Sequence, residues 1–293
     1  MSFGPHLLLA LLEGTVTAFV LALTALGLSL VFGMMRIVNV AHGEFFMLGA
    51  VLAWAFSTLV PGMPALGFLL ALVGSALVVG GVAIVADRLI LRRLNYAPEA
   101  TIVATIGLLY IIQQVVLTVY GPNANPVVPP INFRVVFPWF GYSGYKLVVI
   151  GASAVMLAAT WYTLTRTRIG LVMRATQFDR ETAQSFGIPV DRVYSAVFAL
   201  GAMLAAVAGV LIVPIQQAHY LMGLDPLLLS FIVVILGGLG SLRGTLVAAF
   251  VIGISDGVIS VFYSATLAKI IATLFVALVL VVRQEGLFGE KRR

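Results

Sequence analysis

The sequence predicts an all-α, polytopic membrane protein, because its composition is apolar, its apolar segments are long, and its basic residues gather in three loops. Of its 293 residues, 61% are hydrophobic and only 10% are charged, with a mean hydropathy of +1.13. A soluble domain has about 25% charged residues, so this chain has too few to cover a water-facing surface. A soluble enzyme is therefore excluded, and lipid is the expected solvent.

Eight segments are apolar enough to cross a bilayer, which takes about 20 mostly apolar residues per helix. They are Leu7–Phe32, Glu44–Val60, Gly67–Ala86, Thr101–Tyr120, Leu147–Leu164, Val193–Pro214, Thr245–Phe262 and Leu267–Val282. A ninth stretch, Leu227–Leu239, is short and ends in glycines, which is typical of a short or broken helix. We therefore expect about 8–10 transmembrane helices. They form one permease-type domain over residues 1–293, with broken or short helices near residues 33–44 and 227–244.

Basic residues predict how the chain is oriented in the membrane. Twelve of the 17 Lys and Arg residues lie in three segments that share one side if the spans alternate. They are Arg88, Arg92, Arg93, Arg166, Arg168, Arg174, Arg180, Arg192, Arg283, Lys291, Arg292 and Arg293. The positive-inside rule makes this side cytoplasmic, with the N-terminus outside and the C-terminus inside. This parity requires Leu227–Leu239 to cross the membrane, or nearly so.

Several functional classes are excluded by residues that the sequence lacks. The chain has no cysteine, and its three histidines are scattered, so neither thiolate chemistry nor a cysteine-ligated or histidine-cluster metal site is expected. The net charge of +6 is too thinly spread for a nucleic-acid surface. The lysines Lys146, Lys269 and Lys291 do not follow glycine, so the chain has no phosphate-binding P-loop. We predict no catalytic residue, metal or cofactor in this chain.

A first glycine-bounded segment, Gly33–Glu44, interrupts the apolar pattern. It places Arg36, Asn39, His42 and Glu44 between two apolar helices, although a charged group at the bilayer centre costs roughly 2.5–3.5 kcal/mol. These residues either line a polar path or form an ordinary cytoplasmic loop, with Glu44 favourably placed at a helix N-terminus.

A second glycine-rich segment, Gly237–Thr245, has a similar pattern. Sliding the sequence by 201 residues lays His42-Gly43-Glu44 on Arg243-Gly244-Thr245, which indicates a weak internal repeat. Transporters commonly place their substrate site between glycine-interrupted helices of two repeats. We therefore predict that the translocation pathway includes Asn39, His42, Glu44, Gly240, Arg243 and Asp256.

Other polar residues lie within the apolar segments. Asp256 is functional by default at such a position, or else it stays protonated or hydrogen-bonds through Ser255 or Ser260. We expect Gln113 and Gln114 to make hydrogen bonds between helices.

The loop over residues 166–192 is polar and predicts an amphipathic helix. Its apolar stripe consists of Leu171, Ala175, Phe178, Thr182 and Phe186, and Gly187 and Pro189 end the helix. Such a helix lies in the lipid headgroups or docks on a protein. Because Asp179 and Glu181 offset Arg174 and Arg180, binding to anionic lipid is disfavoured and a protein partner is favoured.

The outer loop Gly121–Tyr145 is rich in proline and aromatic residues. It predicts an interfacial aromatic belt or, alternatively, a docking surface.

Three blocks resemble, in the same order, those of the branched-chain amino acid ABC transporter permeases. They are Ala25–Ala50 with its Asn39…His42-Gly43-Glu44 core, the loop with Arg174-Ala175 and Gly187–Arg192, and Ile235–Thr245 with its glycines. The resemblance covers nearly the whole chain. It implies a permease subunit of an ABC importer in the bacterial inner membrane, which moves a small amino acid, most simply a branched-chain one.

The resemblance also implies partners. They are a second permease subunit, identical or paralogous, two cytoplasmic ATPases that bind ATP and Mg²⁺, a periplasmic substrate-binding protein, and membrane lipid. It identifies the ATPase-coupling loop with Arg174, Ala175, Asp179, Arg180, Glu181, Phe186 and Gly187. Two alternatives stay open: an ABC permease for urea, short amides or other amino acids, and an ion-coupled secondary transporter that uses Asp256 or Glu44.

Overall fold

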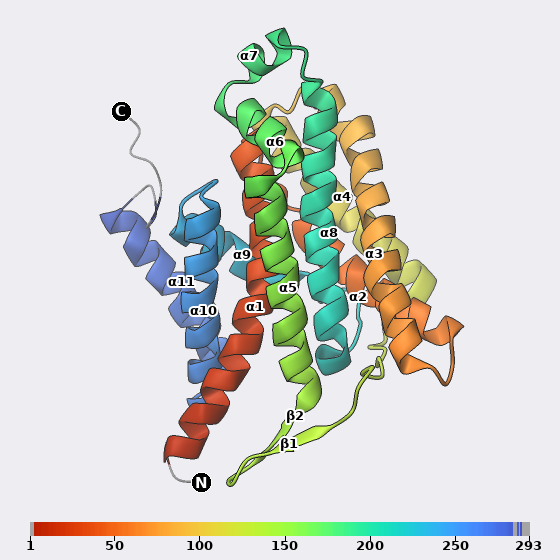
Figure 1. Ribbon diagram of the computed structural model, residues 1–293, viewed down its shortest axis with the longest axis vertical. Coiled ribbons are helices and arrows are strands. Elements are labelled where there is room, and N and C mark those ends of the chain that lie inside the picture. The colour runs from red at the N-terminus through yellow and green to blue at the C-terminus, as the bar shows by residue number, and fades with distance from the viewer. Residues whose placement is uncertain (1–2, 284–285, 287, 289–293) are drawn as a thin grey trace.

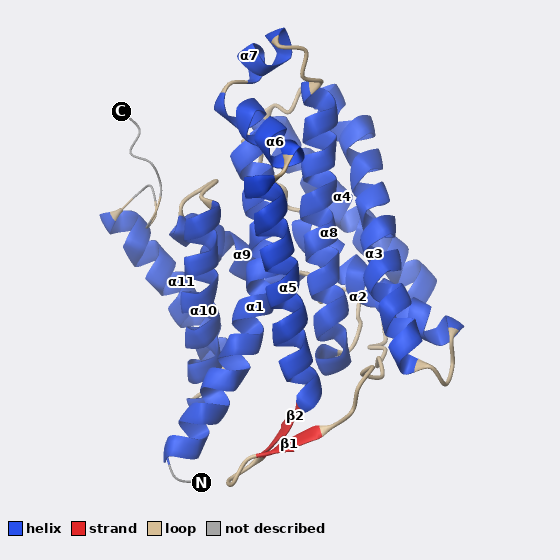
Figure 2. Cartoon of the chain, viewed as in Figure 1, coloured by secondary structure: helices blue, strands red, loops and turns tan. Residues whose placement is uncertain are grey.

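The computed structural model describes residues 3–283, 286 and 288, so the basic residues Lys291, Arg292 and Arg293 lie outside the described part. The described residues form eleven α-helices and one two-stranded hairpin (Figures 1 and 2). The helices are α1 (Phe3–Met35), α2 (His42–Leu59), α3 (Pro64–Ala86), α4 (Pro98–Tyr120), α5 (Gly144–Arg166), α6 (Arg168–Phe178), α7 (Arg180–Ser185), α8 (Val190–Gln216), α9 (Leu224–Gly237), α10 (Leu242–Phe262) and α11 (Ala265–Val282). A π-helical turn, η1 (Asp87–Leu91), and a 3-10 turn, η2 (Arg92–Leu94), extend α3. The strands are β1 (Arg134–Val136) and β2 (Gly141–Ser143), which pair antiparallel.

The predicted fold class, an all-α polytopic membrane protein, is confirmed. Six described helices are long and apolar enough to span a bilayer: α1, α3 with η1, α4, α5, α8 and α10. The helices α2 and α11 account for the other two predicted spans, and the ninth segment is the short helix α9 of 14 residues.

Two long helices, α1 and α8, form the centre of the bundle and run in opposite directions (Figure 1). Most of their apolar surface is buried inside the protein. They cross at Gly27 and Gly201, where a Cβ added to Gly27 would lie 2.5 Å from the Gly201 carbonyl oxygen. Small residues at this crossing allow the two backbones to touch.

The packing around this crossing shows an internal repeat. The helix α3 packs on α8 as α10 packs on α1, and α2 packs on α8 as α9 packs on α1. Both long helices end at a non-glycine residue in the left-handed region, Arg36 (φ 53°) and Gln217 (φ 67°), and a short helix follows each. The repeat therefore pairs α1–α3 with α8–α10.

The predicted register of the repeat, which laid residues 42–44 on residues 243–245, is corrected by this packing. In that register the repeat counterpart of α2 would be α10, whereas in the structure the counterpart of α2 is α9. The sequence match depended on a polar residue, a glycine and a capping residue, and this pattern opens many helices.

The first predicted break lies inside the helix bundle, beside α1. After Met35 the chain folds back along α1, and His42 Nε2 lies 2.9 Å from the Thr24 carbonyl oxygen. Thr24 is 11 residues before the end of α1 (35 − 24), or about 16 Å along its axis. An ordinary loop between two spans would not fold back in this way, since α2 begins beside Thr24, about two-thirds of the way along α1.

The second short helix, α9, begins at the same place. A Cβ added to Gly43 would lie 2.3 Å from the Gly223 carbonyl oxygen, so the first turns of α2 and α9 touch. At its other end, α9 leads to Gly240, whose added Cβ would lie 3.0 Å from Gly33 Cα. The two glycine-broken segments are thus neighbours, as the sequence predicted.

The predicted amphipathic helix over residues 166–192 is two helices, α6 and α7. The chain is extended at Asp179 (φ −151°, ψ 108°), and the Asp179 carboxylate accepts a hydrogen bond from the Thr182 backbone N–H at 3.0 Å. Asp179 thereby caps α7, and its preference for that position explains why the single helix is interrupted. The two helices lie at one end of the bundle, with the β1–β2 hairpin at the other (Figure 1).

Candidate translocation site

A cluster of buried polar side chains lies where α2 begins. Asn39, His42 and Glu44 are each at most 1% exposed. The Asn39 side-chain oxygen accepts a hydrogen bond from the Ala41 N–H at 3.1 Å, a local turn that directs the chain into α2. Each of the three side chains keeps one buried polar atom with no hydrogen-bond partner in the described structure: Asn39 Nδ2, His42 Nδ1 and Glu44 Oε2. Such atoms are costly in a protein interior, and they leave this cluster with unused hydrogen-bonding capacity.

The helix α4 closes this cluster on one side. Gln113 Nε2 donates a hydrogen bond to Glu44 Oε1 at 2.9 Å, and the Thr105 hydroxyl accepts one from the Val40 N–H at 3.2 Å. The predicted hydrogen bond of Gln113 between helices is confirmed. For Gln114 the prediction is wrong, because its amide donates to Thr118 on the same helix.

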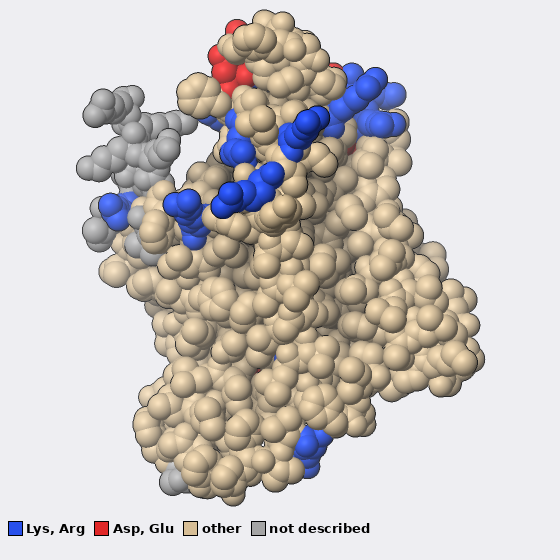
Figure 3. Space-filling model, in the orientation of Figure 1, with Lys and Arg blue, Asp and Glu red and all other residues tan. Residues whose placement is uncertain are grey.

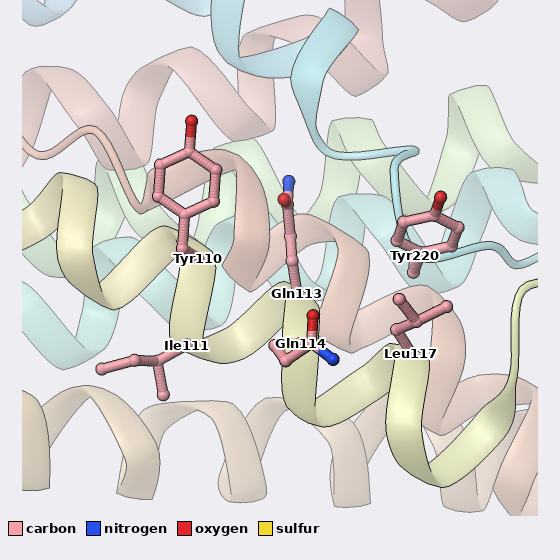
Figure 4. Close-up of a pocket in the computed structure, with 6 residues that line it drawn as sticks. All are labelled: Tyr110, Ile111, Gln113, Gln114, Leu117 and Tyr220. Carbon is pink, nitrogen blue, oxygen red and sulfur yellow. The ribbon is translucent and has the colours of Figure 1, made fainter.

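A groove runs along α4 beside Gln113. It has a volume of about 370 Å³ and is lined by Tyr110, Ile111, Gln113, Gln114, Leu117 and Tyr220. Figure 4 shows Tyr110, Gln113 and Leu117 projecting from one side of α4, with Tyr220 beyond Leu117. Gln113 therefore joins the groove to the buried Glu44 carboxylate.

The outer face of α4 is unusually open. Only 22% of the residues in its most apolar 18-residue stretch are buried, and Tyr110 is 65% exposed. Polar groups on this face, Gln114 and Thr118 among them, are poorly suited to lipid. This side of the chain is therefore suited to face another subunit or a polar path.

The remaining predicted pathway residues lie elsewhere. Gly240 lies against Gly33 after α9, and the Arg243 guanidinium lies 5.9 Å from the centre of the Trp161 ring. Asp256 lies in α10 within electrostatic reach of Lys269. The structure thus brings together Asn39, His42 and Glu44, and not the other three.

Two ion pairs at helix ends were missed by sequence reasoning. Lys269 Nζ lies 2.6 Å from Asp225 Oδ2, joining α11 to the first turn of α9, and Lys146 Nζ lies 2.5 Å from Glu13 Oε1, joining α5 to α1. Asp225 occupies the first turn of its short helix, as Glu44 does in α2. Had the repeat been placed in the register of the structure, the sequence could have indicated this correspondence.

A second polar cluster joins the α3–α4 connection to α8. Arg92 and Asp191 form an ion pair at 2.6 Å, and Ser195 donates a hydrogen bond to the buried Asp87 carboxylate. Tyr96 packs edge-on against Tyr194. These contacts fix the start of α8 just after α7.

The predicted coupling loop presents its apolar stripe outward. Phe178 is 93% exposed and Phe186 83% exposed, and Leu171, Ala175 and Thr182 are exposed with them. The opposite side of α6 and α7, with Gly170, Met173 and Ala183, is buried against the bundle.

The charged residues of the loop have structural contacts of their own. Arg174 donates a hydrogen bond to the Leu164 carbonyl oxygen, and the Arg180 guanidinium lies 5.4 Å from the centre of the Tyr194 ring. Hydrogen bonds from the side chain and backbone of Thr182 hold the pKa of Asp179 below its usual value. Glu181 is exposed, and Gly187 adopts φ +81°, which favours glycine.

Comparison with known proteins places this architecture in a family. The family described as "Branched-chain amino acid transport system / permease component" matches residues 10–282. The chain belongs to this family. As a member of this permease family it is a transport protein, and neither an enzyme nor an ion-coupled transporter is favoured.

Two of the similar proteins match over nearly their whole length, and a third matches over about half of it. The high-affinity branched-chain amino acid transport system permease protein BraD of Pseudomonas aeruginosa is 27% identical over 97% of this chain and 96% of its own. LivH of Escherichia coli, with the same description, is 26% identical over 97% and 96%. The ribose import permease protein RbsC of Haemophilus influenzae is 28% identical over 51% of this chain and 49% of its own.

Proposed function

We propose that this chain is the membrane subunit of an ABC importer that moves a branched-chain amino acid across the bacterial inner membrane. The family match and the specificity of the similar permeases support this substrate class. Urea, short amides and other amino acids, the alternative substrates within the same mechanism, are not favoured by these matches.

The observation that carries the proposal is the outward-facing stripe on α6 and α7. Phe178 and Phe186 are large apolar side chains on polar helices, which is the expected surface for a protein partner rather than for lipid. We assign this partner as a cytoplasmic ATPase that binds ATP and Mg²⁺. Movement of the docked loop reaches the bundle through Arg180, which lies over Tyr194 of α8.

The charges of the visible surface support the orientation that we propose. Figure 3 shows a band of basic side chains at the end that carries α6 and α7, acidic side chains above it, and an almost uncharged middle zone. By the positive-inside rule this end is cytoplasmic, with the N-terminus outside. The β1–β2 hairpin and the Gly121–Tyr145 loop then face the periplasm, where a substrate-binding protein docks.

The substrate path is assigned to the open face of α4, between this chain and a second permease subunit. This face carries Tyr110, Gln113 and Gln114, and it leads to the polar cluster at the start of α2. Of the predicted pathway residues, Asn39, His42 and Glu44 keep this role. Gly240 lies in the close glycine contact between α1 and the α9–α10 connection.

Replacing the loop from Arg174 to Gly187 with a flexible linker tests the coupling role. We expect the reconstituted complex to lose ATP-dependent uptake, and Phe178→Ala with Phe186→Ala to weaken ATPase binding. Tyr263→Ala is the matched control, because Tyr263 is 77% exposed and lies after α10, far from the loop in the chain. Uptake that persists with the flexible linker would contradict the role of α6 and α7.

A further inference from the structure

We propose that Glu44 is the site that binds the ammonium group of the transported amino acid, and that Gln113 holds this site closed until the substrate arrives. This inference rests on the proposed permease function and names the chemistry of its central site. It concerns one hydrogen bond, from Gln113 Nε2 to Glu44 Oε1 at 2.9 Å.

The Glu44 carboxylate has capacity that the protein does not use. The residue is fully buried, Oε1 accepts from Gln113, and Oε2 has no hydrogen-bond partner in the described structure. A carboxylate accepts several hydrogen bonds and prefers charged donors, which make the shorter and stronger bonds. With a single neutral amide donor, the Glu44 carboxylate accepts fewer and weaker hydrogen bonds than it can.

Among the ion pairs of the described residues, none involves Glu44. Its polar neighbours at the start of α2 are Asn39, whose Nδ2 is unpartnered, and His42, whose Nε2 contacts the Thr24 carbonyl oxygen. The ionic partner that a buried carboxylate requires is therefore expected to come from outside the chain.

Gln113 is placed to exchange with such a partner. It lies on α4 with its side chain lining the groove of about 370 Å³, so it contacts both the groove and Glu44. Rotation of its side chain into the groove frees Oε1, and an ammonium N–H of the substrate then replaces the amide N–H. The exchange substitutes one donor for another and transfers no proton.

The rest of the groove is suited to the apolar part of such a substrate. Ile111, Leu117 and the rings of Tyr110 and Tyr220 line it beside Gln113. An amino acid with a branched aliphatic side chain would bury that side chain against these groups while its ammonium reaches Glu44.

The absence of cysteine in the chain allows a direct test. Gln113→Cys places a single thiol in this subunit beside Glu44, and Gln114→Cys places one on the same groove without that neighbour. Each full-length variant, in vesicles with its partner subunits, is treated with a cationic aminoethyl and an anionic sulfonatoethyl methanethiosulfonate reagent. Modification of this subunit is followed by mass spectrometry.

We expect the ratio of cationic to anionic reaction rates to be about tenfold higher at position 113 than at position 114, because the carboxylate attracts the cation. Adding Glu44→Gln should reduce the ratio at 113 to that at 114. The leucine fragment isoamylamine, which keeps the ammonium, should slow modification at 113. The fragment 4-methylpentanoate, which keeps the carboxylate, should not.

Equal ratios at the two positions, a ratio at 113 that survives Glu44→Gln, or protection by 4-methylpentanoate alone would overturn the inference. A thiol at 113 that reacts with neither reagent would also overturn it, since the site would then not open to the groove. If Glu44→Gln does not fold, the two cysteine variants and the two fragments still decide the matter. None of these readouts requires uptake, so their failure is distinct from a failure of the proposed function.

Discussion

The contact between Gly43 and Gly223 offers the sharpest test of the fold, because it joins the starts of the two short helices. We predict that Gly43→Ala separates α2 from α9 and destabilises the protein. The added Cβ would lie 2.3 Å from the Gly223 carbonyl oxygen and 2.7 Å from Leu227 Cβ. Two backbone segments would have to move apart by about 1 Å to restore van der Waals contact.

The expected cost follows from the rigidity of this contact. Overpacking a well-packed interior costs about 1–3 kcal/mol, and the backbone position of Gly223 favours the upper part of that range. The matched control is Gly81→Ala in α3, because a Cβ at Gly81 meets no atom within 4 Å. Alanine is the better helix former by about 1 kcal/mol, so this control should be neutral or slightly stabilising.

Thermal unfolding of the two variants in the same detergent, followed by intrinsic fluorescence, measures the difference. Gly43→Ala should unfold at a clearly lower temperature than Gly81→Ala, and its uptake should fall as well, since Gly43 lies between His42 and Glu44 of the polar cluster. Equal unfolding temperatures for the two variants would refute the placement of α2 against α9.

Three further predictions concern contacts at the ends of the bundle. The ion pair between Lys146 and Glu13 is partly exposed, so Lys146→Met should lower the free energy of unfolding by only about 0.2–1 kcal/mol, and a double-mutant cycle with Glu13→Gln measures the pair itself. Asp179→Ala should unwind α7, whereas Asp179→Asn should preserve the cap. Hydrogen exchange of the Thr182 amide measures the difference, and exchange that stays slow in Asp179→Ala would refute the cap. The pKa of Asp179 is lowered by Thr182, so the contribution of its charge is present above the pKa of the unfolded chain and is lost as pH falls through the lower folded value. Gly187→Ala should destabilise the end of the coupling loop by about 1 kcal/mol, because Gly187 has φ +81°, and unchanged proteolysis of the loop would contradict this.

Hydropathy and glycine position predicted most of the helices. Each predicted span coincides with a helix, and the predicted short segment Leu227–Leu239 belongs to α9, whose 14 residues are fewer than the about 20 that a full span takes. The fold-back after Met35 was predicted only as a break, since its depth depends on the contact of His42 with Thr24. No local sequence pattern encodes a contact of this kind between a side chain and a backbone carbonyl oxygen 18 residues earlier.

The candidate site was predicted only in part, because contacts between helices cannot be read from local sequence patterns. The polar residues of Gly33–Glu44 were recognised as costly in a membrane, and the structure gathers three of them at the start of α2. Arg243 was grouped with them through a repeat register that the packing does not follow, and Asp256 because it is an ionisable residue inside an apolar segment. The role of Gln113 required knowing that α4 packs beside α2, which sequence spacing does not show.

The central claim is tested most directly by leucine uptake into proteoliposomes that contain this chain, its second permease subunit and both ATPases, with the binding protein added outside. The account predicts uptake that requires ATP inside the vesicles and the binding protein outside, and that persists when an uncoupler abolishes ion gradients. Uptake that continues without the ATPases and stops with the uncoupler would contradict it.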